Sequence, residues 1–454
     1  MSTYQLAFRF SAARRAMLAL VAAALVTLFA PTAQATKIER VLSPGGIEIW
    51  LVRDATVPLI ALDFAFQGGS AQDPEGKFGV CNMVLDLLDE GAGELHGNAF
   101  HELLERKAIE MNFTASRDHV RGTLRTLKEN QDEAFNLLRL ALTTPHFEVG
   151  AVERIRAQVM SQLQQATTTP NDIANRTWWN AAFPGHPYSR PVDGAIETVP
   201  RITADDLHAY VRRVFARDTL KVAMVGDIDA ATAGRLVDGT FGSLPAKAEL
   251  VPVPNVTPQG LGRRIVVDLD VPQTSVTFGG AGVARDDPDF MAAYIVNHIL
   301  GGGSFSSRLF QEVREKRGLA YGIFDSLVGF NHSAVLIGGT AVRADATGEA
   351  IEVIEEQVSK MAKDGPTAEE IAKAKSYLKG SFALGLDTST KIASQLVTMQ
   401  LENLGIDYIE RRPALIDAVT INDAKRVAKR LLDSGLLYAL VGRPKGVTSK
   451  GRGD

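Results

Sequence analysis

Two periodicities of apolar residues divide the chain into expected strands and helices. Apolar and polar or small residues alternate in "VPLIALDFAFQ" (57–67) and again in "VPQTSVTFGGAGV" (271–283), which predicts strands with one buried face. Apolar residues recur at helical spacing in "QDEAFNLLRLALTT", "EVGAVERIRAQVMSQLQQAT", "GEAIEVIEEQVSKMAK" and "TAEEIAKAKSYLKGSFAL". Strands and helices therefore occur together without a strict strand–helix–strand alternation, which favours an α+β fold.

The chain also repeats itself. In 57–93 and in 271–303 a Val-Pro opens an alternating strand, an acidic loop with a proline follows, and an apolar helix ends in glycines. Between the halves, 242–264 is rich in Pro, Gly and Val and has no helical period. We therefore expect two similar domains, 36–245 and 263–454, joined by a linker at 246–262. Each is expected to be a sheet rich in antiparallel pairs with helices packed on one face.

The N-terminus has the features of a secretory signal peptide. Arg14 and Arg15 precede the short apolar run "AMLALVAAALVTLFA", and Ala33 and Ala35 follow it at the spacing of a cleavage site. We expect residues 1–35 to be removed near Ala35, giving a periplasmic protein that no membrane segment holds after cleavage. An uncleaved anchor is the competing interpretation.

Charge and cysteine content argue against nucleic-acid binding, an internal disulfide and a reactive thiol. The chain carries 49 Lys and Arg against 53 Asp and Glu, and no basic stripe with interleaved aromatic residues suggests nucleic-acid binding. Cys81 is the single cysteine of the 454 residues, so no internal disulfide forms. Its apolar neighbours predict a buried, unreactive thiol.

The apolar helix "GVCNMVLDLL" (79–88) places Asn82, Leu85 and Asp86 at i, i+3 and i+4, on one helix face. Metal hydrolases use this spacing for two ligands and a base. Here, however, an amide is a poor zinc ligand, Leu85 has no proton to move, and Asp86 is a single carboxylate. We therefore expect no metal at this helix.

Three long motifs resemble the M16 metallopeptidases, the pitrilysin or insulinase family. They are "AFPGHPYSRPVDG" (182–194), the segment "ITADDLHAYVRRVFARDTLKVAMVGDID" (202–229) after it, and "GGGSFSSRLFQEVREKRGLAYGIFDSL" (301–327). The resemblance implies the M16/LuxS-like metallohydrolase fold and the M16B type, in which two such chains pair. The family's zinc motif is H-x-x-E-H, and Asn82, Leu85 and Asp86 stand at its three positions. Its third ligand, a later Glu, corresponds here to Glu153 or Ile155.

The same resemblance gives the second half a role in catalysis. Arg314 and Tyr321 match the Arg/Tyr pair that the half without zinc contributes to the family's active site, where they stabilise substrate and transition state. A surface ion pair for Arg314 and a place in the sheet core for Tyr321 are the alternatives. Gly301, Gly302 and Gly303 are either a helix end with a flexible exit or a substrate loop, because they resemble the glycine-rich loop of the non-catalytic alpha subunit of mitochondrial processing peptidase.

The expected function is a non-zinc-binding subunit of a heterodimeric M16B peptidase, inactive alone. Zinc belongs to a partner chain with H-x-x-E-H, peptides are the substrates, and this chain has no cofactor of its own. Peptides are expected to bind along an exposed sheet edge, for which "NFTASRD" (112–118) is a candidate. The alternative is a proteolytically inactive binding or structural protein. His101 and Glu105 in "HELLE" resemble H-E-x-x-H but are interpreted as a solvated helix face, and His96 and His119 as isolated.

Overall fold

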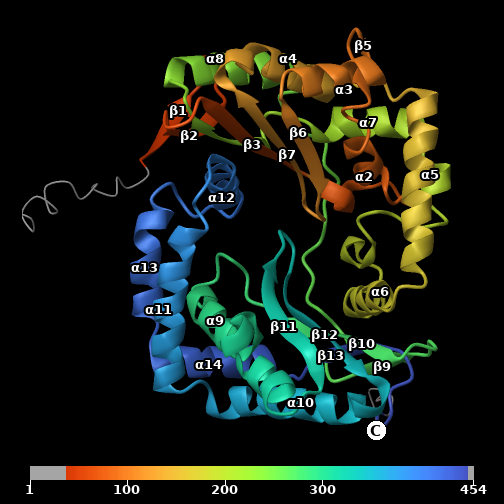
Figure 1. Ribbon diagram of the computed structural model, residues 1–454, viewed down its shortest axis with the longest axis vertical. Coiled ribbons are helices and arrows are strands. Elements are labelled where there is room, and N and C mark those ends of the chain that lie inside the picture. Colours follow the sequence, from red (N-terminus) through yellow and green to blue (C-terminus); the bar gives the residue numbers. More distant parts are fainter. Residues whose placement is uncertain (1–36, 448–454) are drawn as a thin grey trace, which may run out of the picture. The chain divides into compact units, whose positions relative to one another are not determined.

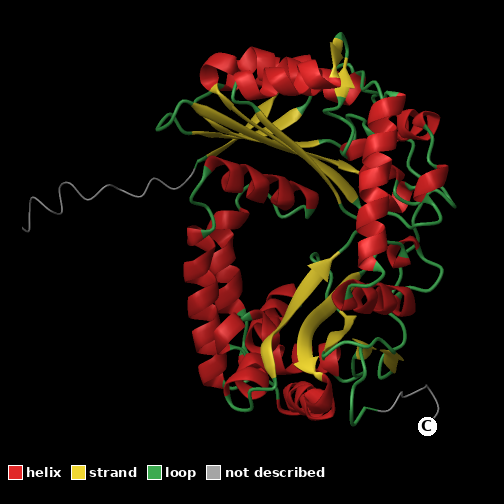
Figure 2. Ribbon diagram, turned by 45° about the vertical axis from the view of Figure 1, so that its right-hand side comes forward, coloured by secondary structure: helices red, strands yellow, loops and turns green. Residues whose placement is uncertain are grey.

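The alternating segments form the middles of two sheets, one in each half of the chain (Figures 1 and 2). The computed structural model describes residues 37–447, so the predicted signal peptide lies outside the described residues. The first sheet has the order β1-β2-β8-β3-β7-β6 and the second the order β11-β12-β10-β13-β9. The first consists of β1 (Ile38–Leu42), β2 (Glu48–Arg53), β3 (Leu59–Gln67), β6 (Glu110–Ala115), β7 (His119–Leu127) and β8 (Lys221–Gly226). The second consists of β9 (Arg264–Val267), β10 (Gln273–Ala281), β11 (Ala320–Gly329), β12 (Ala334–Arg343) and β13 (Leu437–Val441).

The two sheets are built on one plan. Read from β2 and from β9, the strands follow the same order, and β2–β8 and β9–β13 are the corresponding parallel pairs among antiparallel ones. The expected α+β fold with two similar, antiparallel-rich sheets is confirmed.

The helices are α2 (Val80–Leu85), α3 (Gly97–Arg106), α4 (Gln131–Thr143), α5 (Val149–Ala166), α6 (Pro170–Ala182), α7 (Ala204–Val214), α8 (Ala230–Phe241), α9 (Phe290–Asn297), α10 (Thr347–Asp364), α11 (Ala368–Leu384), α12 (Ser389–Leu401), α13 (Tyr408–Ala418) and α14 (Ile421–Leu432). Within 37–447, none of them combines the length and apolar character that a membrane crossing requires.

Matching local signals start equivalent helices in the two halves. Thr203 and Asp206 form a reciprocal capping box at the start of α7, and Thr420 and Asp423 form the same box at the start of α14. Each box satisfies backbone N–H groups that a helix start leaves without partners. Each helix then leads into the strand that joins the parallel pair, β8 or β13.

The second face of each sheet is covered by a helix from the other half (Figure 1). Helix α6 of the first half packs on β10 and β13, and α12 of the second half packs on β3 and β8. The large residues of β3 and β10, such as Phe64 and Phe278, belong to the core on the opposite face. Between them stand small residues, and a Cβ added to Gly279 would lie 2.9 Å from the ring of Trp178 on α6. Small residues therefore let each exchanged helix approach its sheet closely.

One buried hydrogen bond to strand backbone fixes each exchanged helix. The indole Nε1 of Trp178 donates to the carbonyl of Leu437 at 3.2 Å, and the amide Nε2 of Gln400 on α12 donates to the carbonyl of Val222 at 2.8 Å. The guanidinium of Arg121 on β7 adds a third link, since it pairs with the buried carboxylate of Asp63 and donates to the carbonyl of Ser394 on α12.

The motif "GHPYSRP" lies where the two halves meet. The buried Tyr188 hydroxyl donates to the Asp118 carboxylate at 2.6 Å and accepts from the backbone N–H of His332 at 3.1 Å. The other oxygen of Asp118 accepts from the N–H of Asn331 at 2.9 Å. The hairpin turn between β6 and β7 is thereby joined to the turn between β11 and β12. Residues 246–262, the predicted linker, contain no helix or strand.

Replacing Gln400 by Leu tests the exchange. The change keeps an apolar side chain in place but removes one buried hydrogen bond to the Val222 carbonyl, a loss that typically destabilises a protein by about 0.5–1.5 kcal/mol. We expect a lower midpoint of urea unfolding followed by circular dichroism. The exposed Gln165→Leu on α5 is the matched control and should leave the midpoint close to that of the wild type. Equal midpoints for the two variants would contradict the proposed importance of the bond.

Candidate functional site

Helix α2 keeps its position although its zinc residues are missing. Gly79 precedes it with φ +102°, and the buried carboxylate of Asp73 accepts hydrogen bonds from the N–H groups of Gly79 (2.7 Å) and Cys81 (2.8 Å). The Cys81 thiol is fully buried, and this burial raises its pKa well above the ordinary value. The predicted burial of the thiol is therefore confirmed, and its lack of reactivity stays a prediction. The first turn of this helix is therefore held by the buried carboxylate of Asp73.

The three degenerate positions, Asn82, Leu85 and Asp86, contact one another or the hydrophobic core. The amide of Asn82 donates to the carboxylate of Asp86 at 3.0 Å, and Leu85 is buried. Partial burial, followed by the negative charges of Asp193 and Asp89, raises the pKa of Asp86. Among residues 37–447, no group of three ligating side chains includes Asp86.

Neither candidate for the third ligand faces a metal position. Glu153 on α5 is exposed and pairs with Arg156 at 3.3 Å, and Ile155 lies in the core of the first half. His101 on α3 has its nearest ion-pair contact, 3.7 Å, with Asp89 and not with Glu105. The interpretation of His96 as isolated is wrong, because its Nδ1 lies 2.6 Å from the Glu148 carboxylate.

Arg314 and Tyr321 lie side by side. Arg314 stands near the end of the helical segment η7 (Phe310–Glu315), whose chain is turned by Gly318 at φ +62°. The N–H of Gly318 donates to the carbonyl of Arg314 and the N–H of Leu319 to that of Val313, so the left-handed glycine ends the helix and satisfies two of its last carbonyls. The Arg314 guanidinium carbon then lies 5.0 Å from the centre of the Tyr321 ring.

A β-bulge presents Tyr321 to solvent. The pairing of β11 with β12 shifts by one residue between Ala320 and Ile323, so Tyr321 falls in the irregular stretch. Bulges re-aim side chains, and Tyr321 is 90% exposed. It is therefore not sheet core, the alternative that its sequence position left open. Arg314 touches Glu315 only distantly, at 3.9 Å, so a firm surface ion pair does not describe it either.

The pair lies on a hollow of about 790 Å³ formed by both halves. Its far side includes Asn171 and Asn175 from the exchanged helix α6. Phe305 and Phe324, which are 69% and 60% exposed, line it together with Tyr321. Exposed aromatic residues gathered around a hollow are typical of a binding surface. Sequence reasoning missed these four residues, since only the exchange of α6 brings the asparagines here.

The glycine run ends the helix that continues from α9 through η5 (His298–Gly302). A Cβ on Gly301 would lie 2.5 Å from the carboxyl carbon of Asp325 on β11, so the glycine permits a close approach. Asp325 is buried and accepts from the side-chain amide of Asn297, but its Oδ2 has no hydrogen-bond partner among the described residues. Burial raises the pKa of this carboxyl well above its ordinary value. The expected helix end is confirmed; a role in substrate handling stays a prediction.

Each sheet ends in two edge strands, β1 and β6 in the first and β9 and β11 in the second. Strand β6, which contains most of the candidate segment 112–118, is the last strand of the first sheet, and β11 is the corresponding edge of the second. Residues Arg117 and Asp118 of that segment are engaged elsewhere: Arg117 donates to the carbonyl of Tyr188, and its guanidinium lies over the Trp179 ring. Only the strand itself remains as a binding edge.

Comparison with known proteins agrees with this geometry. Residues 49–195 match the family described as insulinase (peptidase family M16), and residues 201–378 match the peptidase M16 inactive domain. The chain belongs to the M16 family. Within that family it is an inactive member, since its counterpart of the zinc helix carries Asn82, Leu85 and Asp86.

Relatives and solved structures extend the match over nearly the whole chain. The "Non-peptidase homolog YmxG" of Helicobacter pylori is 28% identical over 346 residues, which are 75% of this chain and 78% of the relative. The mitochondrial-processing peptidase subunit beta of Blastocladiella emersonii is 23% identical, covering 91% and 89%. A peptidase M16 inactive domain structure from Pseudomonas fluorescens has a TM-score of 0.84 at 26% identity and covers 91% of this chain and 99% of its own.

The buried carboxyl of Asp325 should make the free energy of unfolding depend on pH. Because its pKa is raised in the folded state, the unfolded chain holds fewer protons between the ordinary carboxyl pKa and the raised one. The free energy of unfolding then falls as pH rises through that window, by up to about 1.4 kcal/mol per pH unit. Asp325→Asn keeps the acceptor for Asn297 and removes the titrating group. We expect its stability relative to wild type to increase from pH 4 to pH 8 in thermal unfolding.

The exposed Asp286→Asn serves as the control for this prediction and should show no such trend. A constant difference between Asp325→Asn and wild type over the whole range would show that Asp325 stays charged in the fold.

Proposed function

We propose that this chain is the non-zinc-binding subunit of a heterodimeric M16B metallopeptidase. The observation that supports the proposal most is the contrast between two sites. The helix at the zinc position has no ligand set, whereas Arg314 and Tyr321 lie together, exposed, on an open hollow. A purely structural derivative has no use for an arginine and a tyrosine held in this way.

Each member of the pair has a defined chemical capacity. The Arg314 guanidinium is permanently charged and offers several donors, so it suits a peptide carbonyl or a terminal carboxylate. The Tyr321 hydroxyl is a donor for the oxyanion that develops when water attacks a peptide carbonyl. The partner's zinc would activate that water. Arg314 also rests on the Phe310 ring, 4.8 Å from its centre, which steadies the guanidinium without using its hydrogen-bond donors.

The substrate would be a peptide bound as an added strand. Strand β11 is an open edge, and its main chain supplies hydrogen bonds that do not depend on peptide sequence. The exposed rings of Phe305 and Phe324 border the same hollow and offer contact surface for apolar side chains. The β11 edge is favoured over β6 in this chain, because it carries Tyr321 itself.

The remaining parts of the proposal come from the sequence. The basic and apolar N-terminus with its cleavage signal near Ala35 supports export to a periplasm, and the partner would be an exported M16 chain with H-x-x-E-H. The chain itself would hold no catalytic cofactor. The competing proposal is a proteolytically inactive M16 protein that binds or organises other proteins, which the non-peptidase homolog among its relatives favours.

Mixing experiments separate the two proposals. We expect the purified chain to cleave no fluorogenic peptide with added zinc, and to raise cleavage strongly when mixed with an H-x-x-E-H chain from the same genome. In the mixture, Tyr321→Phe should lower kcat by about 10²-fold, the range seen when one oxyanion donor is removed. Arg314→Ala should lower kcat/KM by a comparable factor.

Arg317→Ala is the matched control. Arg317 lies three residues from Arg314 but pairs with Glu312 at 2.6 Å, away from the hollow. Its loss should leave the mixed activity unchanged. Zinc-dependent cleavage by the chain alone would refute the subunit proposal, and full activity of both Arg314→Ala and Tyr321→Phe would refute the assigned roles. No association with any such chain would favour the inactive binding protein.

A further inference from the structure

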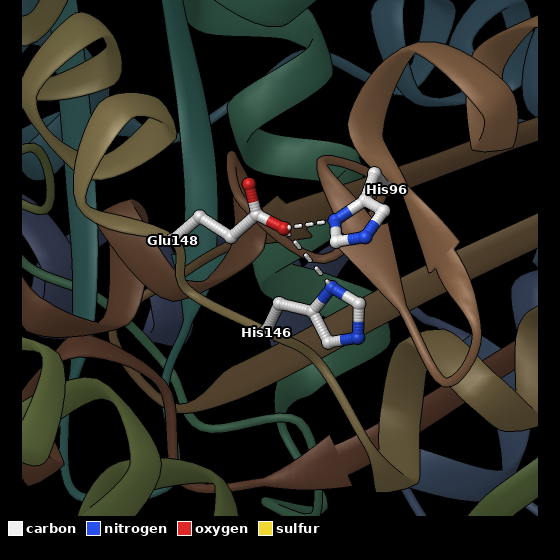
Figure 3. A group of neighbouring side chains, drawn as sticks. All are labelled: His96, His146 and Glu148. Atoms are coloured by element: carbon white, nitrogen blue, oxygen red, sulfur yellow. Dashed lines mark hydrogen bonds and ion pairs between the residues drawn. The ribbon is translucent and has the colours of Figure 1, made fainter.

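Two histidines and a glutamate from separate segments converge on the surface of the first half (Figure 3). His96 ends the short strand β5 (Leu95–His96) and precedes α3, while His146 and Glu148 lie just before α5. Their candidate ligand atoms all lie within 4.8 Å of one another. We propose that His96, His146 and Glu148 form a binding site for one divalent cation of the zinc class, separate from the degenerate zinc helix.

The backbone holds His146 firmly in this position. Its N–H donates to the carbonyl of Gly91 at 3.0 Å, and the N–H of Gly93 donates to the carbonyl of Thr144 at 3.1 Å. These bonds attach the segment before α5 to the hairpin of β4 (Gly91–Ala92) and β5. Gly91 has φ +123°, and a Cβ there would lie 3.2 Å from Nδ1 of His146. The hairpin glycine therefore keeps the space beside this nitrogen open.

The hydrogen bonds of His146 leave one ring nitrogen ready for a cation. Nε2 lies 2.7 Å from the carbonyl of Gly93, so it must be the protonated nitrogen. In the neutral ring Nδ1 then carries a lone pair, and this atom is buried with no hydrogen-bond partner. It faces Oε1 of Glu148 at 3.4 Å. A lone pair opposite a carboxylate oxygen is unfavourable unless a positive charge lies between them or on the ring.

A metal ion supplies that charge in the arrangement proteins commonly use. A metal-bound histidine usually donates its other N–H to a backbone carbonyl or carboxylate, as His146 does to Gly93. Two ligands at zinc bond lengths of about 2.0–2.1 Å in a tetrahedral site lie about 3.3 Å apart, close to the separation of His146 Nδ1 and Glu148 Oε1. Three protein ligands of this kind leave a fourth position for water.

Glu148 and His96 are free to complete the set. Glu148 stands at the N-cap of α5 but its side chain makes no capping bond, and its carboxylate turns toward the two imidazoles (Figure 3). His96 Nδ1 is hydrogen-bonded to Glu148 at 2.6 Å, so these two atoms must separate by under about 1 Å to take a metal between them. Their side chains are 80% and 44% exposed, which permits the movement.

A second cluster nearby provides an internal control. Asp89, Glu90 and His101 also lie within ligand distance of one another. Glu90, however, is already paired with Arg154, and no nitrogen in that cluster is buried without a partner among residues 37–447. It lacks the feature that marks His146. Cation binding should therefore depend on His96, His146 and Glu148 and not on His101.

Zinc titration of the tag-free, chelator-treated chain tests the proposal. Isothermal titration calorimetry with zinc chloride should show one tight equivalent, and zinc should raise the thermal unfolding temperature because it binds only the folded arrangement. His96→Ala and Glu148→Ala should each weaken this binding at least about 10-fold, the scale on which metal sites respond to lost support. His101→Ala should bind zinc as tightly as wild type.

His96→Ala carries the test even if changes at His146 impair folding, because the His96 side chain is exposed. Equal zinc affinity of wild type and His96→Ala would overturn the proposal, as would loss of binding in His101→Ala alone. A histidine NMR spectrum of wild type that is unchanged by zinc, while His146 titrates with acid, would show that a proton supplies the positive charge instead.

Discussion

Each sheet of this protein depends on the other half of the chain to bury its second face. Helix α12 covers β3 and β8, and α6 covers β10 and β13. Uncovered, these faces would expose small residues and the backbone carbonyls that Gln400 and Trp178 now satisfy. Burial of apolar surface beneath these helices stabilises the fold, so neither half is complete alone. The predicted linker at 246–262 lies between the strands of the first sheet and those of the second. The covering helices do not follow this division, because α6 precedes the linker and packs on the second sheet, and α12 follows it and packs on the first.

The exchange also places residues of the first half beside the Arg314 and Tyr321 pair of the second half. Helix α6 belongs to the first half, yet its Asn171 and Asn175 form one side of the hollow that holds Arg314 and Tyr321. The capped start of α2 preserves the core of the same half through Asp73 and Cys81. The side-chain amide of Asn82 donates one hydrogen bond to the carboxylate of Asp86 on the same helix face. The first half therefore helps to shape the hollow of the second, although its own helix α2 lacks a zinc ligand set.

The sequence predicted the strands and helices that local patterns determine. It did not predict which segments distant in sequence the fold brings into contact. Alternation located β3 and β10. The same alternation also indicated a packing surface. The small residues of β3 and β10 lie on the face against which α12 and α6 pack closely. Periodicity cannot tell which helix that is. Likewise His96 and His146 are distant in sequence, and a backbone pairing between the β4–β5 hairpin and the segment before α5 brings them together.

The positions of the histidines show what converts a residue type into a metal site. His101 and Glu105 have the helical spacing of a metal motif, but His101 contacts Asp89 and no ring nitrogen there is fixed by a backbone group. His146 has no motif around it, yet Gly93 fixes its tautomer and leaves a buried lone pair facing a carboxylate. Ligand capacity therefore depends on what holds the other nitrogen of the ring, which is a property of the folded backbone. A helix with H-x-x-E-H at the right place can lose that capacity by substitution, and a surface loop can acquire it by packing.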